Sequence, residues 1–330
     1  MRQALAAFVA AGLVAAIVAT LAIGEEERPA GDAATGRWLP LASAGLERSE
    51  VAAARIGRSI YVAGGFEGAS GGATTAAVER YDIRRDRWQR VRSMPIGLNH
   101  PVAVARRGRL YVSGGYSAES GLADASRVLL EYDPGRDRWR RLPPAPTPRA
   151  AHAAAVIGRR LYVAGGANAS GSLRSLEIYD FRARRWRRGP SFPAPARNHL
   201  TGVASGGRFY VLAGRDASNF AAAARYDPRR RRWQRLPSLR TPRGGIASAR
   251  LRDGRIVVFG GEDLSPGGAT IRPVEIFDPR TRRWRSLPGM RTPRHGLGGV
   301  ALGNRVYAVE GGPEPGLRFS DALEYLDVRP

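Results

Sequence analysis

The 330-residue chain is 43% hydrophobic and 25% charged, which excludes a wholly disordered protein, and its 41 glycines and 23 prolines argue against a mainly helical fold. It contains no cysteine, which excludes disulfides, zinc–thiolate sites, iron–sulfur clusters and cysteine nucleophiles. Its 53 basic residues, all of them arginine, outnumber 29 acidic residues, and the resulting net charge of +24 raises the local concentration of anions.

The N-terminal segment is the first element of the chain and predicts export. Arg2 precedes an uncharged apolar run from Ala4 to Ile23, and a helix of that length would cross the bilayer's hydrocarbon core of about 30 Å. We predict that residues 1–23 form an apolar helix that is either a cleaved signal peptide or a retained membrane anchor. Both roles place the rest of the chain outside the cytoplasm, anchored or secreted or periplasmic. Residues 24–36 are predicted to be a flexible tether.

Six tryptophans divide the remainder of the chain into repeats, with 47 to 51 residues between neighbours: Trp38, Trp88, Trp139, Trp186, Trp233 and Trp284. Each repeat contains an aromatic and β-branched run that ends in paired glycine or a variant of it, as in Tyr61–Gly65. A second run ends in Tyr-Asp or a close variant, as in Tyr81-Asp82. Four short strand-like runs per repeat predict one four-stranded propeller blade each.

The glycine pair, the Tyr-Asp pair and the tryptophan, at these spacings over residues 38–327, resemble the kelch-repeat family. The resemblance implies an all-β, six-bladed kelch β-propeller over residues 37–330, with each blade running from an inner to an outer strand. The chain begins with a Trp-bearing strand, so we expect residues 37–42 to close the ring as the outer strand of the last blade. Ala213, Val257 and Glu310 depart from the repeat pattern, and local distortion is expected there.

Five arginines enter the inner strands at corresponding positions, whereas the second repeat has Leu98 there: Arg48, Arg149, Arg197, Arg243 and Arg294. Inner strands surround the channel of a propeller, so five guanidiniums would meet near its mouth. Because Arg binds carboxylate and phosphate bidentately, we predict an anion-binding pocket there. Five neighbouring residues are predicted to take part in ligand binding: Asn99, His100, Asn198, His199 and His295. The alternative is that each arginine pairs with carbonyls or acidic side chains of a neighbouring blade.

The four histidines all lie near the start of an inner strand: His100, His152, His199 and His295. The last three follow their arginines by three, two and one positions respectively. Side chains alternate along a strand, so these histidines are not expected to point to one place. We therefore predict no metal site and no cofactor.

Runs of arginine fill the tight turns at the opposite end of the predicted propeller, as in Arg229–Arg232. Such runs are either a solvated face or a surface that binds anionic membrane headgroups. Nucleic acid is not an expected partner, because the chain has no reader motif and is predicted to be exported.

These patterns predict a non-catalytic exported binding module whose arginine-ringed central pocket takes an anionic small molecule or an acidic protein segment. The alternative is an enzyme, a sugar-acid epimerase or mutarotase resembling the exported bacterial kelch proteins that act on sialic acid. For that chemistry the acid–base candidates are the arginine ring with His100, His199, His295, Glu50 and Glu262. A copper radical oxidase is excluded, because its Tyr–Cys crosslink requires a cysteine.

Overall fold

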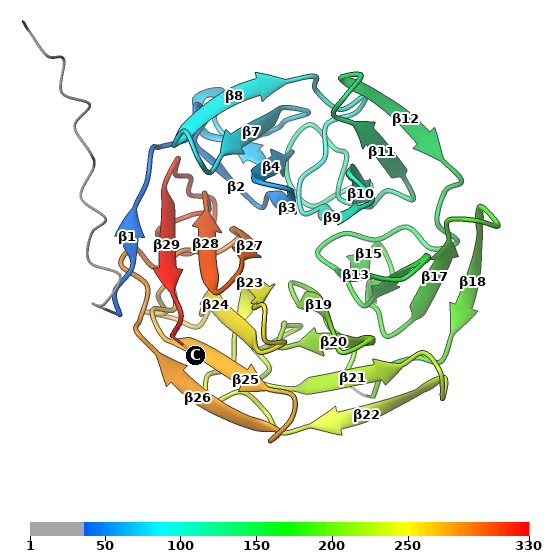
Figure 1. Cartoon of the computed structure of the whole chain (residues 1–330). Coiled ribbons are helices and arrows are strands. Elements are labelled where there is room, and N and C mark those ends of the chain that lie inside the picture. The colour runs from blue at the N-terminus through cyan, green and yellow to red at the C-terminus, as the bar shows by residue number, and fades with distance from the viewer. Residues whose placement is uncertain (1–35, 194, 330) are drawn as a thin grey trace, which may run out of the picture. The chain divides into compact units, whose positions relative to one another are not determined.

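The computed structural model describes residues 36–193 and 195–329, which form antiparallel sheets and one turn of 3₁₀-helix, η1 (Gly68–Ser70). Six four-stranded sheets surround a central channel as blades (Figure 1). The predicted apolar helix over residues 1–23 and the tether up to residue 35 lie outside the described residues. Among the residues described, no helix is long and apolar enough to cross a membrane.

The strands of each blade run antiparallel from the channel outward, and the first five blades follow the order of the chain. Blade 1 contains β3 (Ala52–Ile56), β4 (Ser59–Ala63), β7 (Val78–Asp82) and β8 (Arg87–Val91). Blade 2 contains β9 (Val102–Arg106), β10 (Arg109–Ser113), β11 (Leu129–Asp133) and β12 (Arg138–Leu142). Blade 3 contains β13 (Ala153–Ile157), β14 (Arg160–Ala164), β17 (Leu176–Asp180) and β18 (Arg185–Gly189).

Blades 4 to 6 repeat this plan. Blade 4 contains β19 (Thr201–Ser205), β20 (Arg208–Leu212), β21 (Ala223–Asp227) and β22 (Arg232–Leu236). Blade 5 contains β23 (Gly244–Arg250), β24 (Ile256–Glu262), β25 (Val274–Asp278) and β26 (Arg283–Leu287). Blade 6 contains β27 (Gly298–Leu302), β28 (Arg305–Val309), β29 (Leu323–Asp327) and, from the other end of the chain, β1 (Leu39–Pro40).

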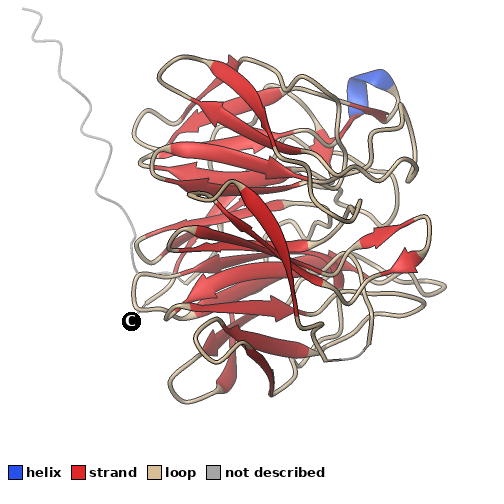
Figure 2. Cartoon of the chain, turned by 90° about the vertical axis from the view of Figure 1, so that its right-hand side faces the viewer, coloured by secondary structure: helices blue, strands red, loops and turns tan. Residues whose placement is uncertain are grey.

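The two ends of the propeller differ in the loops they carry. The long loops and the entries to the inner strands lie at one end, which we call the top face and which is on the right in Figure 2. Two small sheets of short strands lie on this face. One contains β2 (Arg48–Ser49), β5 (Phe66–Glu67) and β6 (Ala73–Thr74). The other is a hairpin of β15 (Ala167–Asn168) and β16 (Gly171–Ser172). The tight turns within the blades form the opposite end, the bottom face.

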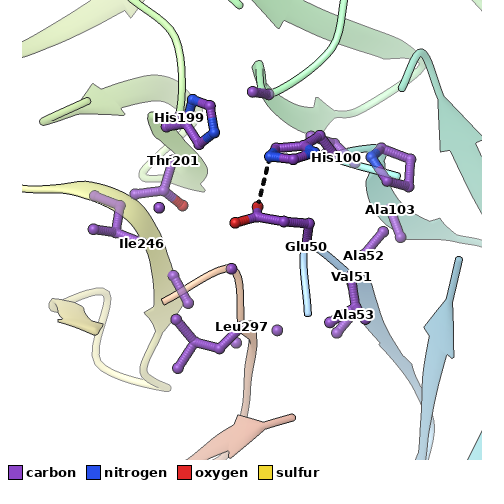
Figure 3. Close-up of a pocket in the computed structure, with 18 of the residues that line it drawn as sticks. Glu50, Val51, Ala52, Ala53, His100, Ala103, His199, Thr201, Ile246 and Leu297 are labelled. Atoms are coloured by element: carbon purple, nitrogen blue, oxygen red, sulfur yellow. Dashed lines mark ion pairs between the residues drawn. The ribbon is translucent and has the colours of Figure 1, made fainter. Parts of the chain in front are cut away.

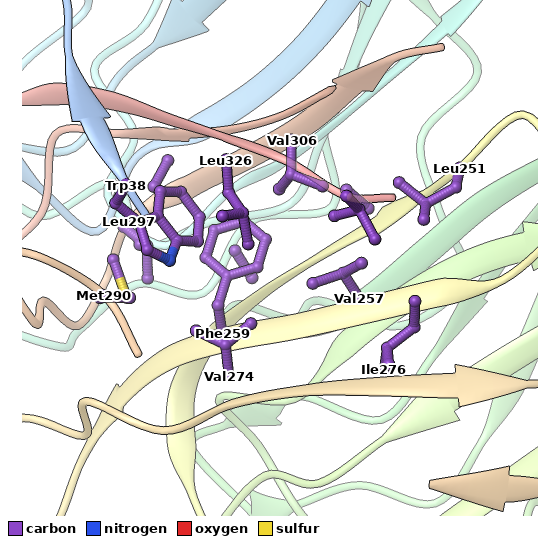
Figure 4. Packing of buried hydrophobic residues seen from close by; sticks show 14 residues of the cluster. Trp38, Leu251, Val257, Phe259, Val274, Ile276, Met290, Leu297, Val306 and Leu326 are labelled. Carbon is purple, nitrogen blue, oxygen red and sulfur yellow. The ribbon is translucent and has the colours of Figure 1, made fainter. Parts of the chain in front are cut away.

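The N-terminal strand closes the ring, as the order of the repeats predicts. In β1, Leu39 lies opposite Tyr325 of β29. Trp38 is 3% exposed and packs against Phe259, with ring centroids 5.6 Å apart, in the cluster of Figure 4. Its indole N–H donates to the carbonyl of Pro288 at 3.1 Å. The other five tryptophans donate in the same way to the preceding blade, so Trp38 completes a ring of equivalent contacts.

The glycine pairs allow neighbouring blades to approach closely. Gly114 has φ +57°, and a Cβ there would lie 2.3 Å from the Arg149 carbonyl oxygen. The second glycine, Gly115, donates its N–H to that same carbonyl at 2.9 Å. The equivalent bond recurs between all six pairs of blades. Ala213 and Glu310 replace the first glycine but adopt the same left-handed conformation, at φ +52° and +53°, so both blades keep their four strands.

Candidate functional site

The five arginines predicted to line the channel mouth are instead buried inside the blades, none of them more than 1% exposed. The Arg149 guanidinium, for example, donates to the Gly165 carbonyl at 2.7 Å and pairs with Glu177 at 3.1 Å. Three of the others pair with a carboxylate on the third strand of a blade: Arg48 with Glu79, Arg243 with Glu275, and Arg294 with Glu324. The ligand-binding assignment is therefore corrected for all five, because their donors are used within the fold.

Two blades lack this ion pair. In blade 2 both members are replaced by leucine, and Leu98 and Leu130 are fully buried in one apolar cluster. In blade 4, no carboxylate among the described residues lies within 4 Å of Arg197. Its guanidinium donates to the Ala213 carbonyl at 2.6 Å and lies 4.8 Å from the Phe192 ring centroid. Burial without a counter-charge lowers the pKa of Arg197 to about 10.

The top end of the channel is a cavity of about 140 Å³. Its walls are largely alanine and glycine, and Glu50, His100 and His199 come together at its mouth (Figure 3). The candidate site therefore consists of imidazoles and a carboxylate.

A ring of left-handed backbone positions turns these three side chains toward the channel. Glu50, His100 and His199 have φ values of +54°, +53° and +49°. The corresponding positions of the other blades are also left-handed: Ala151, Gly245 and Gly296. A hydrogen bond links one position to the next, as in the His100 N–H to the Glu50 carbonyl at 2.9 Å. The alternation expected of extended strands fails here, because these residues precede the strands and are not extended.

The Glu50 carboxylate lies at the centre of the group. Its Oε2 is 3.1 Å from His100 Nε2, and its Oε1 is 3.1 Å from His295 Nδ1. His295 Nδ1 is also 3.5 Å from Glu262 Oε1, which in turn accepts from the Arg215 guanidinium at 2.6 Å. The guanidinium of Arg215 is thus already paired with a carboxylate.

Asn99 fixes the orientation of the His100 ring. The Asn99 amide nitrogen donates to Thr74 Oγ1 at 2.8 Å and to the Gly121 carbonyl at 3.3 Å. Its amide oxygen therefore faces His100 Nδ1, at 2.7 Å. The Asn99 oxygen can only accept, so His100 donates its Nδ1–H to it. When the ring is neutral, its lone pair is therefore on Nε2.

Asn198 does the same for His199. Its amide nitrogen donates to Ser172 Oγ at 2.7 Å, and Ser172 donates to Asp216 Oδ1 at 2.7 Å. The amide oxygen of Asn198 accepts from His199 Nδ1. The two Asn-His pairs therefore present two equivalent Nε2 atoms to the mouth of the channel. Their rings lie 4.8 Å apart between centroids.

The titration of the group follows from burial and from these contacts. Burial alone would raise the pKa of Glu50, but His100, the hydrogen bond from His295, and His199 outweigh it and hold the pKa well below its ordinary value. Burial lowers the pKa of His100 and, aided by Arg215, lowers that of His199 further. Burial also opposes charge on His295, yet Glu50 raises its pKa. Glu50 therefore stays ionised although it is buried.

His152 does not join this group. It is 2% exposed, and its Nε2 lies 2.9 Å from Ser113 Oγ. Burial and the nearby Arg149 lower its pKa to about 3. It is part of the blade packing.

The predicted residues Asn99, His100, Asn198, His199 and His295 do lie together, around Glu50. Arg215 and Ser172 were not predicted from the sequence; they contact the group through Glu262 and Asn198. The sequence does indicate which residues share this position. Glu50, His100 and His199 each lie two residues after the arginine position of their repeat, so they occupy equivalent places around the channel.

The bottom face carries exposed arginines in the turns between the third and fourth strands of five blades. The bottom-face arginines are Arg84, Arg85, Arg87, Arg136, Arg138, Arg182, Arg184, Arg185, Arg229–Arg232, Arg280, Arg282 and Arg283. Within the described part of the chain, only Arg85 and Arg136 of this set lie within 4 Å of a carboxylate. The first Asp of each turn instead accepts backbone N–H groups, as Asp227 does from Arg229 at 2.9 Å. The turns are therefore held by hydrogen bonds from their backbone N–H groups to this Asp side chain, and not by ion pairs of the arginines.

Comparison with known proteins identifies related sequences and folds. The model of the KLHDC2/KLHL20/DRC7 Kelch-repeats domain matches residues 50–261, and the Kelch motif matches residues 247–291. Kelch repeat and BTB domain-containing protein 12 of Danio rerio is 31% identical over 152 residues, or 44% of this chain and 24% of that protein. Kelch-like protein terF of Aspergillus terreus is 33% identical over 141 residues, or 40% of this chain and 31% of that protein.

The same fold occurs in a solved structure. The structure of YjhT matches with a TM-score of 0.74 at 15% identity and covers 88% of this chain and 97% of that one. The chain spans less than a third of the length of the two curated relatives, so the similarity concerns their kelch repeats and not those whole proteins.

Proposed function

Because this chain belongs to the KLHDC2/KLHL20/DRC7 kelch-repeats domain family, we propose that it is a non-catalytic binding module for an acidic protein segment, bound by the bottom-face arginines. Kelch-repeat propellers are generally protein-binding modules, which supports a protein partner. The observation that carries the choice of an acidic partner is the set of exposed arginines, nearly all without a carboxylate within 4 Å.

The charge distribution favours the bottom face over the channel as the anion site. The channel mouth carries Glu50 and Glu262, and the guanidinium of Arg215 is paired with Glu262. Without a bound cation, the two carboxylates there would repel an incoming carboxylate. At the bottom face, by contrast, the arginines sum to a positive field that attracts acidic segments and accelerates their association.

The interaction is expected to be weak and sensitive to salt. An exposed ion pair contributes about 0.3–0.5 kcal/mol, so three pairs contribute about 1 kcal/mol, or about five-fold in affinity. Salt at about 0.15 M screens such charges beyond about 8 Å.

The test measures fluorescence anisotropy of a labelled Glu/Asp-rich 20-residue peptide and of its Gln/Asn counterpart. We expect the purified protein to bind only the acidic peptide, and Arg229→Gln/Arg230→Gln/Arg231→Gln to weaken it about five-fold. The matched control replaces three exposed top-face arginines, as Arg174→Gln/Arg291→Gln/Arg318→Gln, and should change the affinity less than about two-fold.

Two outcomes would overturn this proposal. Equal losses in the two triple variants would show that net charge, and not the bottom face, binds the peptide. Binding to anionic vesicles with no binding to the peptide would show a membrane surface as the partner in place of a protein.

The proposed place of action is outside the cytoplasm, as in an exported bacterial kelch protein. The apolar run Ala4–Ile23 supports this proposal. Cell fractionation of the full chain and of a chain lacking residues 1–23 tests it. We expect the full chain in the envelope or the medium and the shortened chain in the cytoplasm, and identical fractions would contradict export.

A sugar-acid mutarotase is a second candidate, because Glu50 and His100 form a buried acid–base pair at 3.1 Å. Such an enzyme also needs a cation that clamps the sugar carboxylate, and the guanidinium of Arg215 is held by Glu262. Exchange spectroscopy on the two anomers of sialic acid tests this candidate. An exchange rate raised by the protein, and lost in His100→Ala, would favour the enzyme over the binding module.

A further inference from the structure

We propose that the mouth of the channel binds one divalent metal ion of the zinc type, with Glu50, His100 and His199 as its ligands. This site lies on the face opposite the bottom-face arginines, and it is independent of the proposed acidic partner. The ligands come from blades 1, 2 and 4, so that only the closed ring brings them together.

The distances fit such an ion. One ligand atom from each of the three residues lies within 4.8 Å of the others. Glu50 Oε2 and His100 Nε2 are already 3.1 Å apart. A tetrahedral zinc ion with bonds of about 2.0–2.2 Å places its ligand atoms about 3.3–3.6 Å from one another. Small ring movements therefore suffice to reach the coordinated geometry.

The second layer of contacts orients all three ligands. Asn99 and Asn198 accept from the Nδ1 atoms of His100 and His199, so each ring offers Nε2. His295 occupies the other oxygen of Glu50 at 3.1 Å, which leaves Oε2 for the ion. A ligating histidine whose other nitrogen is hydrogen-bonded in this way is the usual arrangement at protein metal sites.

The contact between Glu50 and His100 also points to a cation. His100 Nε2 and Glu50 Oε2 lie 3.1 Å apart, close to the separation of two ligand atoms on one zinc ion. An ion between them converts this contact into two bonds. The neighbouring group of Glu50, Glu262 and His295 also has suitable spacing, but Arg215 and the Gly316 N–H already hold Glu262.

Ligand chemistry selects the class of ion. Two imidazole nitrogens and one carboxylate suit Zn²⁺ and similar borderline ions, whereas Mg²⁺ and Ca²⁺ prefer oxygen ligands. Three protein ligands leave a fourth position, and here it faces the cavity of about 140 Å³. A water molecule is expected to fill that position.

The experiment uses the purified full chain, stripped with a chelator and titrated with Zn²⁺ in a calorimeter, with Co²⁺ absorption as a readout of coordination geometry. We expect one ion per chain, a tetrahedral Co²⁺ spectrum, and no heat from Mg²⁺. His199→Ala should weaken Zn²⁺ binding by more than about 100-fold, and Asn198→Ala, which removes only the orienting contact, by about 10–100-fold.

Asp263→Asn is the matched control, because Asp263 is an exposed carboxylate on the same face, and it should leave binding unchanged. Should His199→Ala fail to fold, Glu50→Gln and His100→Gln provide the same test with side chains of similar size. The absence of one-to-one binding would overturn the proposal. If Asp263→Asn and His199→Ala weaken Zn²⁺ binding equally, the ion binds non-specifically to surface groups and the proposal is overturned.

Discussion

The buried pair of Arg149 and Glu177 provides the sharpest test of how the blades are held. Arg149→Leu leaves the Glu177 carboxylate, 0% exposed, without its counter-charge, and Glu177→Leu leaves the guanidinium unpaired. Each single change is expected to lower the free energy of unfolding by about 3–5 kcal/mol. The double change reproduces Leu98 and Leu130 of blade 2, so its cost falls to about 2–3 kcal/mol, mainly from hydrogen bonds lost at Gly165 and Ser175.

Urea unfolding followed by tryptophan fluorescence measures all four corners of this cycle. The double change should lower the free energy of unfolding by at least about 3 kcal/mol less than the sum of the two single changes. Arg197→Leu is the matched control, because its removal strands no carboxylate, and it should cost less than Arg149→Leu. If the cost of the double change instead equals the sum of the two single costs within about 0.5 kcal/mol, Arg149 and Glu177 are not coupled in the folded protein and the reasoning is refuted.

Three further perturbations test the closure, the glycine pairs and the charge inside blade 6. Trp38→Ala should lower the free energy of unfolding by about 3–5 kcal/mol in urea, and an unchanged midpoint would contradict closure by β1. Gly114→Ala should cost several times more than Gly57→Ala, which has a similar φ of +59° but no neighbour within 4 Å; equal shifts in melting temperature would contradict the close-approach argument. Burial raises the pKa of Glu310 to about 7, against Arg48, which lowers it. The folded state therefore holds that proton more tightly than the unfolded state, so stability should fall as pH rises from about 4.5 to about 7. Glu310→Gln should flatten this slope in melts across that range, and an unchanged slope would refute the assignment.

The fold could be predicted from the sequence because its signals are local and repeated. The tryptophan, the glycine pair and Tyr-Asp each report on one strand or turn, and their spacing reports on the blade. Even the closure followed from the order of the repeats, since the repeats begin at Trp38 and the last Tyr-Asp variant contains Tyr325. The roles of the arginines could not be read in this way, because the partner of Arg149 lies on the third strand of its blade, 28 residues later. Comparison between the repeats does indicate the pairing. In the second repeat the arginine and the glutamate are both replaced by leucine, at Leu98 and Leu130, which suggests that the two positions are in contact.

The arrangement of the site could not be predicted from the strand pattern, because it depends on left-handed backbone conformations just before the inner strands. Treating His152, His199 and His295 as strand residues predicted that they do not all point to one place. His152 does lie apart, against Ser113. His199 is left-handed, however, and His295 reaches Glu50 of the next blade. Gly245 and Gly296 occupy the ring position of His199 in two other blades, and glycine there is a sign of positive φ. The conformation was therefore visible where glycine occupies the ring and hidden where a functional side chain does.

The chemistry of this propeller arises where its repeats differ. Six equivalent positions surround the channel in the left-handed conformation, which favours glycine and costs other residues about 1 kcal/mol or more. Two blades have glycine there, whereas Glu50, His100 and His199 bear that cost and converge on one point. Strained positions with reactive side chains are the places where function is expected. Their preceding asparagines are also specific to those blades, because Asn99 and Asn198 come before the two ring histidines and Ala150 and Gly244 come before Ala151 and Gly245. These five polar side chains agree in place and orientation, and this agreement supports the proposed shared ligand.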